Sequence, residues 1–226
     1  MTEPPKITRP RSDERRFIDL QMGVFGGQAF LVAFDIGLFP LVAEAPRTIA
    51  EVAREKGLAE RSAEALLLLC TSLDLLEKRG DRFVLTPLAE DYLLPESPTY
   101  YGDFLRAAVI AQPELTSYPS VKRAILENRS QIYDGDKLFE AHEQQAARAR
   151  EFTLMMHGHS IAPALTWPNN IDLSETHQMI DIGGGSGAHA IGAALRWPQL
   201  SATVLEIPTV CGVAREMIDR YHLQDR

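Results

Sequence analysis

The segment Asp181-Ile-Gly-Gly-Gly-Ser-Gly187 constrains the fold of this 226-residue chain more than any other feature. It stands between a short apolar stretch and an apolar segment with helical periodicity, and a second apolar stretch ends at Glu206. Short apolar strands that alternate with helices are typical of a parallel sheet covered by helices. The sequence therefore predicts β-α-β-α order, the first half of an α/β Rossmann-like domain, at residues 171–226. The predicted elements are strands at 178–182 and 202–205 and helices at 188–196 and 209–221.

Glycines at alternate positions, Gly183, Gly185 and Gly187, predict a ligand-binding loop at the carboxyl end of the first strand. Glycine permits positive φ and has no Cβ, so the backbone can approach a ligand closely. In such domains the ligand lies near the N-terminus of the following helix. Glu206 follows Gly187 by 19 residues, a spacing at which an acidic side chain can accept hydrogen bonds from ribose hydroxyls.

Two cofactors satisfy this pattern, NAD and S-adenosylmethionine. Gly183, Gly185 and Ala188 also fit the G-x-G-x-x-A fingerprint of NAD-binding domains, so the glycines alone leave both open. Asp181, two residues before the first glycine, favours S-adenosylmethionine. Its amino and sulfonium groups are positive, and it has no pyrophosphate that a carboxylate would repel.

The region 17–100 predicts a mostly α-helical domain with the helix-turn-helix-hairpin order of a winged helix. Thr48 and Glu51 form a capping box, which is typical of a helix start. A core stripe on the helix that follows is indicated by leucines at three- and four-residue spacing, Leu66, Leu69, Leu73 and Leu76. The predicted elements are one or two apolar helices at 17–42, a short helix from Thr48 to Gly57, a helix at 61–77, two strands within 76–85 and a helix at 88–93.

This winged-helix order is compatible with two functions. A DNA-binding regulator would use residues 61–76 as its recognition helix, but that helix is too rich in leucine to present polar side chains to base edges. The formal charge of −8 also has the wrong sign for a nucleic-acid partner. A packing and dimerisation module is therefore favoured, in which the apolar helices at 17–42 are buried against a second copy of the chain.

The termini and cysteines suit a cytoplasmic protein. Residues 1–16 are predicted to be a flexible, solvated arm, because they are rich in proline and charged residues. They lack the apolar centre of a signal peptide. The apolar stretch at 24–42 is interrupted by polar residues, glycine and proline, so no membrane crossing is expected. Cys70 and Cys211 have no CxxC partner, and His157 and His159 face different directions on a helix, so no disulfide or metal site is expected.

The glycine motif and a preceding helical block carry a resemblance to a known family. The block is Phe152-Thr-Leu-Met-Met-His-Gly-His-Ser160, within a helical connector at 101–170 whose predicted helical segments are 102–111, 120–128 and 137–164. Together with Met179–Gly187 and Val204-Leu-Glu-Ile-Pro208, it resembles the small-molecule O-methyltransferases of plants and bacteria, which include caffeate and hydroxyindole O-methyltransferases. That family has an N-terminal winged-helix dimerisation domain and uses S-adenosylmethionine. The resemblance covers essentially the whole chain.

The resemblance implies a role for each matching residue. Gly183 and Gly185 would contact the amino-acid end of the cofactor through their backbone, with Asp181 close by. Glu206 would hold the ribose, although the family more often has aspartate there. The remaining matches are Ile207 against the adenine, Ser160 near the methionine carboxylate, and Phe152 and Met156 lining the substrate pocket, for which plain core packing is the alternative.

The resemblance also implies that part of the catalytic apparatus lies outside this sequence. The family's catalytic base is a histidine on the far half of the Rossmann-like domain, so no catalytic residue is assigned before Arg226. We expect a fragment of a homodimeric O-methyltransferase acting on a small aromatic or polyketide-like acceptor, or one half of a split enzyme completed by a second chain. A non-catalytic pseudo-methyltransferase or interaction module is the alternative.

Overall fold

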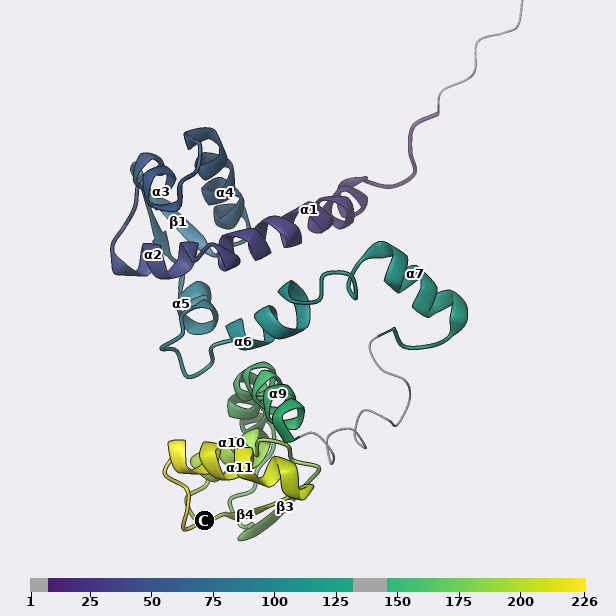
Figure 1. Cartoon of the computed structure of the whole chain (residues 1–226), viewed down its shortest axis with the longest axis vertical. Coiled ribbons are helices and arrows are strands. Elements are labelled where there is room, and N and C mark those ends of the chain that lie inside the picture. The colour runs from purple at the N-terminus through teal and green to yellow at the C-terminus, as the bar shows by residue number, and fades with distance from the viewer. Residues whose placement is uncertain (1–7, 132–145) are drawn as a thin grey trace, which may run out of the picture. The chain divides into compact units, whose positions relative to one another are not determined.

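The computed structural model describes residues 8–131 and 146–226, and the polypeptide divides into two compact units, Met1–Thr86 and Pro87–Arg226 (Figure 1). Each unit is described by itself. The first consists of four helices and an antiparallel hairpin within the described residues. Its elements are α1 (Arg15–Asp35), α2 (Leu38–Glu44), α3 (Ile49–Lys56), α4 (Glu60–Ser72), β1 (Leu76–Arg79) and β2 (Arg82–Leu85).

The predicted capping box is present at the start of α3. The Thr48 hydroxyl accepts a hydrogen bond from the Glu51 N–H, and the Glu51 carboxylate accepts one from the Thr48 N–H. Arg82 of the hairpin donates to the same carboxylate at 3.0 Å. These bonds satisfy backbone donors that a helix start leaves free, and they attach the hairpin to α3. The hydrogen bonds to Thr48 and then the charge of Arg82 hold the pKa of Glu51 below its ordinary value.

The prediction that the second helix extends to residue 77 is wrong, because α4 ends at Ser72. Asp74 adopts a positive φ of 57°, and the Leu75 N–H donates to the Cys70 carbonyl at 2.9 Å. This is a Schellman motif, in which a residue in the left-handed region closes the helix. Leu73, predicted in the core stripe, is consequently 39 % exposed, whereas Leu76 is buried as the first residue of β1.

The second unit holds the glycine motif. Its elements are α5 (Pro87–Leu93), α6 (Gly102–Phe104), the π-helical segment η1 (Leu105–Ile110), α7 (Tyr118–Glu127), α9 (Ala146–Thr166), the 3₁₀ helix η2 (Trp167–Asn170), β3 (Gln178–Ile182), α10 (Ala188–Arg196), β4 (Ser201–Leu205) and α11 (Pro208–Arg220). The predicted β-α-β-α order after residue 177 is confirmed. A helix was also predicted at 137–164, and its first nine residues lie outside the described ranges.

The strands β3 and β4 pair in parallel, with Asp181 opposite Val204. Helices α9, α10 and α11 gather beside this sheet (Figure 1). Side chains alternate along each strand, so Val204 faces α10 while Ile180, Ile182 and Leu205 are 66 %, 78 % and 57 % exposed on the other face.

Helices α9 and α10 approach closely at Gly192. A Cβ at this position would lie 2.0 Å from the Ala164 carbonyl oxygen, so only glycine permits this backbone contact. The contact brings α9 over the start of the Rossmann-like half. It thereby sets the distance between α9 and the glycine loop.

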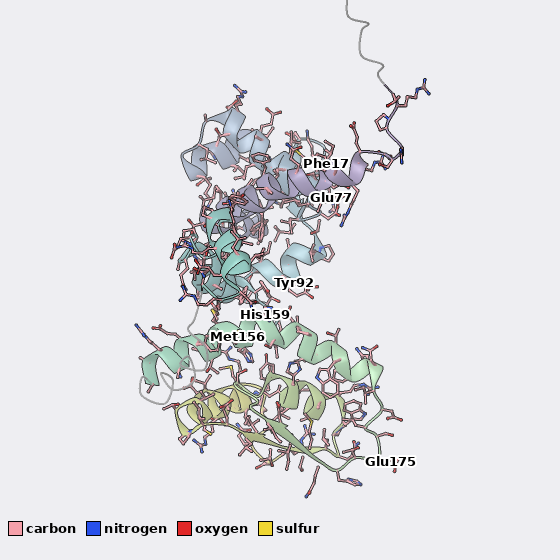
Figure 2. All side chains as sticks on the ribbon, turned by 90° about the vertical axis from the view of Figure 1, so that its right-hand side faces the viewer. Phe17, Glu77, Tyr92, Met156, His159 and Glu175 are labelled. Atoms are coloured by element: carbon pink, nitrogen blue, oxygen red, sulfur yellow. The ribbon has the colours of Figure 1, made fainter. Side chains whose placement is uncertain are left out.

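Helix α1 exposes most of its apolar side chains within a single chain. Its buried residues are Gly26, Ala33 and Phe34, while Phe17 is 70 % exposed (Figure 2). Among helices in the described ranges, α1 is long and apolar enough to cross a membrane by length and composition. The same test is passed by core helices of soluble proteins and by signal sequences, so it is weak evidence for a membrane.

Candidate functional site

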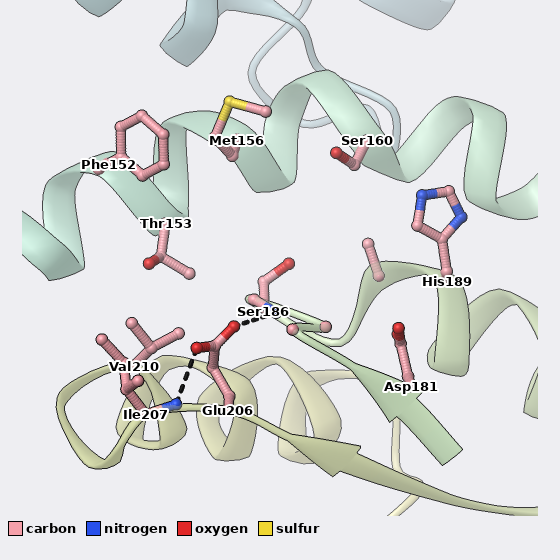
Figure 3. A pocket seen from close by; sticks show the side chains of 14 residues that line it. Phe152, Thr153, Met156, Ser160, Asp181, Ser186, His189, Glu206, Ile207 and Val210 are labelled. Carbon is pink, nitrogen blue, oxygen red and sulfur yellow. Dashed lines mark hydrogen bonds between the residues drawn. The ribbon is translucent and has the colours of Figure 1, made fainter. Parts of the chain in front are cut away.

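One pocket in the second unit brings together the eight residues that the family resemblance assigns to cofactor or acceptor binding. It is a cavity of about 270 Å³ between α9, the loop after β3, the start of α10 and the residues after β4 (Figure 3). This volume is close to the lower end, about 300 Å³, of small-molecule sites in general. The predicted residues that line it are Phe152, Met156, Ser160, Asp181, Gly183, Gly185, Glu206 and Ile207.

The glycine loop is a tight turn that only small residues allow. The Gly187 N–H donates to the Gly184 carbonyl at 2.8 Å, and Gly185 has a φ of 57°. A Cβ at Gly184 would lie 2.8 Å from the Asp181 carboxylate and 3.0 Å from the Val204 side chain. The loop can therefore pass over the strand ends only without side chains at these positions.

Glu206 follows β4 and reaches across to the loop. Its carboxylate accepts hydrogen bonds from the Gly185 N–H at 3.0 Å and from the Ile207 N–H at 2.7 Å, drawn as dashed lines in Figure 3. These two bonds fix the carboxylate at the edge of the pocket. Each carboxylate oxygen keeps a second lone pair, so the group can still accept two hydrogen bonds from a diol.

Asp181 lies on β3 at the opposite side of the loop. Its Oδ2 atom is buried and has no hydrogen-bond partner among the described residues. A buried acceptor without a donor costs about 1–3 kcal/mol. Because the side chain also lines the pocket, a ligand that carries N–H groups would satisfy it.

The other wall of the pocket is a stripe of α9. Phe152, Met156 and Ser160 are four residues apart, so they share one face of the helix. Figure 3 shows these side chains on the side of α9 that borders the pocket, across from Glu206 and the loop. The predicted pocket role of Phe152 and Met156 therefore has the required geometry.

A buried pair beside the pocket, His157 and Ser186, was not predicted as a site. The His157 Nδ1 atom lies 2.8 Å from the Ser186 hydroxyl, and the two residues are 7 % and 5 % exposed. Burial, and to a lesser degree the positive charge of Arg220, lowers the pKa of His157 from 6.5 to about 4. Helical spacing could have indicated this histidine, because it follows Thr153 by four residues and precedes Ser160 by three.

His159 takes no part in the pocket. It lies on another face of α9 than His157, and its ring packs against Phe104 and Tyr101 with centroid distances of 4.8 and 5.6 Å (Figure 2 labels His159). His159 is therefore a packing residue. Across the described residues, no group of three or more histidine, cysteine, aspartate or glutamate side chains could hold a metal ion.

Other lining residues escaped the sequence analysis. Thr153, His189 and Val210 also face the cavity (Figure 3). His189 could have been found from its place one residue after Ala188, in the first turn of α10. No lysine or arginine is among the described residues that line the cavity, so its two carboxylates have no such side chain to pair with there.

Comparison with known proteins also divides the chain into two regions, although the first matched region extends beyond Thr86. An O-methyltransferase dimerisation domain model matches residues 18–95, and an O-methyltransferase domain model matches residues 118–225. The chain is 32 % identical over 203 residues to the 3-hydroxy-5-methyl-1-naphthoate 3-O-methyltransferase of Streptomyces sahachiroi, covering 88 % of this chain and 57 % of that protein. It is 26 % identical to the N,N-dimethyltransferase OxyT of Streptomyces rimosus, covering 96 % and 63 %.

Among solved structures, human N-acetylserotonin methyltransferase in complex with S-adenosylmethionine matches with a TM-score of 0.68 and 28 % identity. The match covers 92 % of this chain and 64 % of the human chain. The chain thus spans about 57–64 % of the length of these relatives. The matched domain models, the relatives and the shared fold show that this chain belongs to the O-methyltransferase family that joins a dimerisation domain to an O-methyltransferase domain.

Proposed function

We propose that the pocket binds S-adenosylmethionine and that the whole protein transfers its methyl group to an oxygen atom of a small aromatic or polyketide-like acceptor. The observation that carries the proposal is the meeting of Asp181, Glu206 and the glycine loop at one cavity. S-adenosylmethionine supplies an activated methyl group on a positive sulfonium. The residues of this chain hold and orient it.

The charges of the pocket favour this cofactor over NAD. A pyrophosphate needs free N–H donors or basic side chains. In this loop the Gly183 N–H donates to the Leu205 carbonyl and the Gly185 N–H donates to Glu206. Two carboxylates at the cavity would repel a pyrophosphate and attract an ammonium or sulfonium group.

Each lining residue has a proposed role that follows this polarity. Because the N–H groups of Gly183 and Gly185 are occupied, their backbone contacts would come from carbonyl oxygens, which accept hydrogen bonds from an ammonium group. Asp181 would accept from the same end of the cofactor. The other proposed roles are Glu206 on the ribose hydroxyls, Ile207 against the adenine, Ser160 near the methionine carboxylate, and Phe152 and Met156 toward the acceptor.

The acceptor class rests on the relatives. The Streptomyces sahachiroi protein is named for O-methylation of a naphthoate, and the human protein for an N-acetylserotonin substrate. OxyT is named as an N,N-dimethyltransferase, so the family resemblance alone does not fix the accepting atom. Phe152 and Met156 offer an apolar wall that suits a flat aromatic ring. Catalysis would then depend mainly on positioning acceptor and methyl group, and we assign no base within this chain.

We further propose a homodimer in the cytoplasm, formed through the first unit. The family model for residues 18–95 describes a dimerisation domain. Within one chain, α1 leaves large apolar side chains exposed, as an interface does. These are Phe17, Ile18, Leu20, Met22, Val24, Phe25 and Val32. A non-catalytic module and a DNA-binding regulator are not favoured, because both matched domains belong to O-methyltransferases.

Calorimetric titration with S-adenosylhomocysteine tests the proposed function. The wild-type chain should bind at micromolar concentration, and Glu206→Ala should bind at least tenfold more weakly because it removes the ribose acceptor. Glu175→Ala is the matched control, since this glutamate is exposed and does not line the cavity. Equal affinity of the wild type and Glu206→Ala would refute the proposed site.

A further inference from the structure

We propose that His157 is a positioning residue for the cofactor pocket, which holds Ser186 and thereby fixes the glycine loop against α9. The inference rests on the proposed function, since it concerns the same pocket. It assigns a role to a histidine that does not itself line the cavity.

The position of Ser186 explains why holding it would matter. It lies between Gly185, whose N–H binds Glu206, and Gly187, whose N–H closes the turn on Gly184. Its own side chain lines the cavity. A displacement of Ser186 would therefore shift the positions of the Glu206 carboxylate and of the loop backbone at the same time.

The position of His157 shows to which wall of the pocket Ser186 would be attached. Met156 precedes it on α9 and Ser160 follows one turn later, and both line the opposite wall of the cavity. The bond from His157 to Ser186 joins residues 29 positions apart and connects the two walls directly. The width of the pocket between α9 and the loop would thus depend on this bond.

The protonation state of the pair allows this hydrogen bond to persist at neutral pH. With its pKa lowered to about 4, His157 is neutral at pH 7 and carries one N–H and one acceptor nitrogen. Whichever partner donates, one hydrogen bond joins the imidazole and the hydroxyl. The Ser186 oxygen then keeps at least one further lone pair for a group in the cavity.

The alternative is that the pair only stabilises the fold. Removing one member of a buried polar pair leaves the other without its hydrogen bond. This destabilises the fold by about 1–3 kcal/mol, whether or not the pocket is affected. A positioning role predicts in addition that affinity depends on the bond, and that a variant which keeps the bond keeps the affinity. Asn places an amide near the position of the imidazole Nδ1, and Thr retains the hydroxyl of Ser, so both variants can keep it.

The test is calorimetric titration of S-adenosylhomocysteine into the whole chain, well below the unfolding temperature of each variant. We expect His157→Leu and Ser186→Ala each to weaken binding about tenfold, and the double variant to weaken it about tenfold rather than a hundredfold, since both remove the same bond. His157→Asn and Ser186→Thr should bind within about threefold of the wild type. His177→Leu, which removes an exposed imidazole outside the pocket, should bind like the wild type.

The outcomes separate this inference from the proposed function. If the wild type binds and Ser186→Ala binds equally well, or if the two losses simply add, the positioning role is overturned while the cofactor site stands. If the wild type does not bind, the proposed function fails and this inference fails with it. Should His157→Leu not fold, the comparison of Ser186→Ala with Ser186→Thr still decides the question.

Discussion

At the scale of single residues, the carboxylates of Asp181 and Glu206 differ in the hydrogen bonds that they accept. Glu206 accepts two backbone hydrogen bonds, whereas the buried Oδ2 of Asp181 has no partner in the described part of the chain. Natural proteins retain such groups where a ligand completes them. Asp181 therefore represents a cost to the ligand-free fold that binding would recover.

Replacement of Asp181 by Ala should weaken ligand binding without lowering the stability of the fold. The variant removes an unsatisfied buried acceptor, so its free energy of unfolding should stay equal or rise by up to about 1 kcal/mol. The affinity for S-adenosylhomocysteine should fall at least tenfold. Urea unfolding and calorimetry measure the two quantities, and Asp219→Ala, an exposed aspartate on α11, should alter neither. A variant that loses stability yet binds normally would contradict this account.

The buried imidazole of His157 predicts a specific pH dependence of stability. Its pKa is about 4 in the folded chain and about 6.5 when unfolded, so between these values the unfolded chain binds more protons. Stability is therefore present above pH 6.5 and is lost as the pH falls toward 4. Between pH 7 and pH 5 the loss should be about 2 kcal/mol by this linkage.

Urea unfolding of the wild type and of His157→Asn at these two pH values checks the prediction. Both proteins contain four carboxylates with lowered pKa values, whose contributions to stability are also lost as the pH falls; these are Glu51, Glu77, Asp172 and Glu216. The difference between the two proteins therefore isolates the contribution of His157. Parallel behaviour of wild type and variant from pH 7 to pH 5 would show that His157 is not buried in its neutral form.

The sequence predicted much of the site at this scale, for two physical reasons. The strand-glycine-helix pattern places Asp181 and the loop beside Glu206, and helical spacing places Phe152, Met156 and Ser160 on one stripe. The bond between His157 and Ser186 could not be predicted in the same way. It depends on how closely α9 packs on the loop, which no local pattern encodes.

At the scale of elements, the contact between α9 and α10 determines the pocket. Gly192 of α10 lies directly against the backbone of α9 at Ala164, and the buried side chains of Ile161, Ala164 and Ala188 form a cluster beside it. The two helices carry opposite walls of the cavity. A change at this crossing should therefore act on both stability and binding.

Gly192→Ala should force the two helices apart. The added Cβ would lie 2.0 Å from the Ala164 oxygen, a backbone atom that cannot move alone, and such overpacking costs about 1–3 kcal/mol. Gly212→Ala on α11 is the matched control, because nothing lies within 4 Å of its Cβ position and alanine favours a helix by up to about 1 kcal/mol. Urea unfolding should show a loss for the first and a gain for the second. An equal response would contradict the close contact.

Local signals predicted these elements better than their ends. The capping box at Thr48 satisfies free backbone N–H groups. The proline at the start of α5 and of α11 has a φ that suits the first helical turn and no N–H to satisfy, so it also marks a helix start. The end of α4 was missed because the leucine spacing continues through Leu73 and Leu76. Asp74 in the left-handed region closes the helix, a conformation that sequence patterns associate with glycine.

At the scale of the whole molecule, the chain combines two units with separate tasks. The sequence already distinguished an α-rich N-terminal region from a C-terminal α/β segment, since hydrophobic periodicity changes between them. It could not determine what covers the exposed side of α1, which under the proposed dimer is a second copy of the chain. In the single chain this helix is mostly exposed.

Burial of α1 against a second copy predicts a change of oligomeric state on substitution. Phe17, Leu20 and Val24 are exposed at helical spacing and form one stripe. Val24→Asp would place a carboxylate in this stripe and should convert a dimer into a monomer, as measured by sedimentation velocity. Ile171→Asp, at an exposed apolar residue after η2, should remain dimeric. A wild-type chain that sediments as a monomer at high micromolar concentration would contradict the proposed dimer.

The central claim is that the pocket between α9 and the glycine loop binds an adenosyl cofactor that carries an ammonium group rather than a pyrophosphate. Parallel calorimetric titrations of the wild-type chain with S-adenosylhomocysteine and with NAD test it most directly, because both ligands share adenosine and differ in the group that extends from the ribose toward Asp181. The account predicts micromolar binding of S-adenosylhomocysteine and no binding of NAD. Binding of NAD, or no heat from S-adenosylhomocysteine with a well-folded chain, would contradict it.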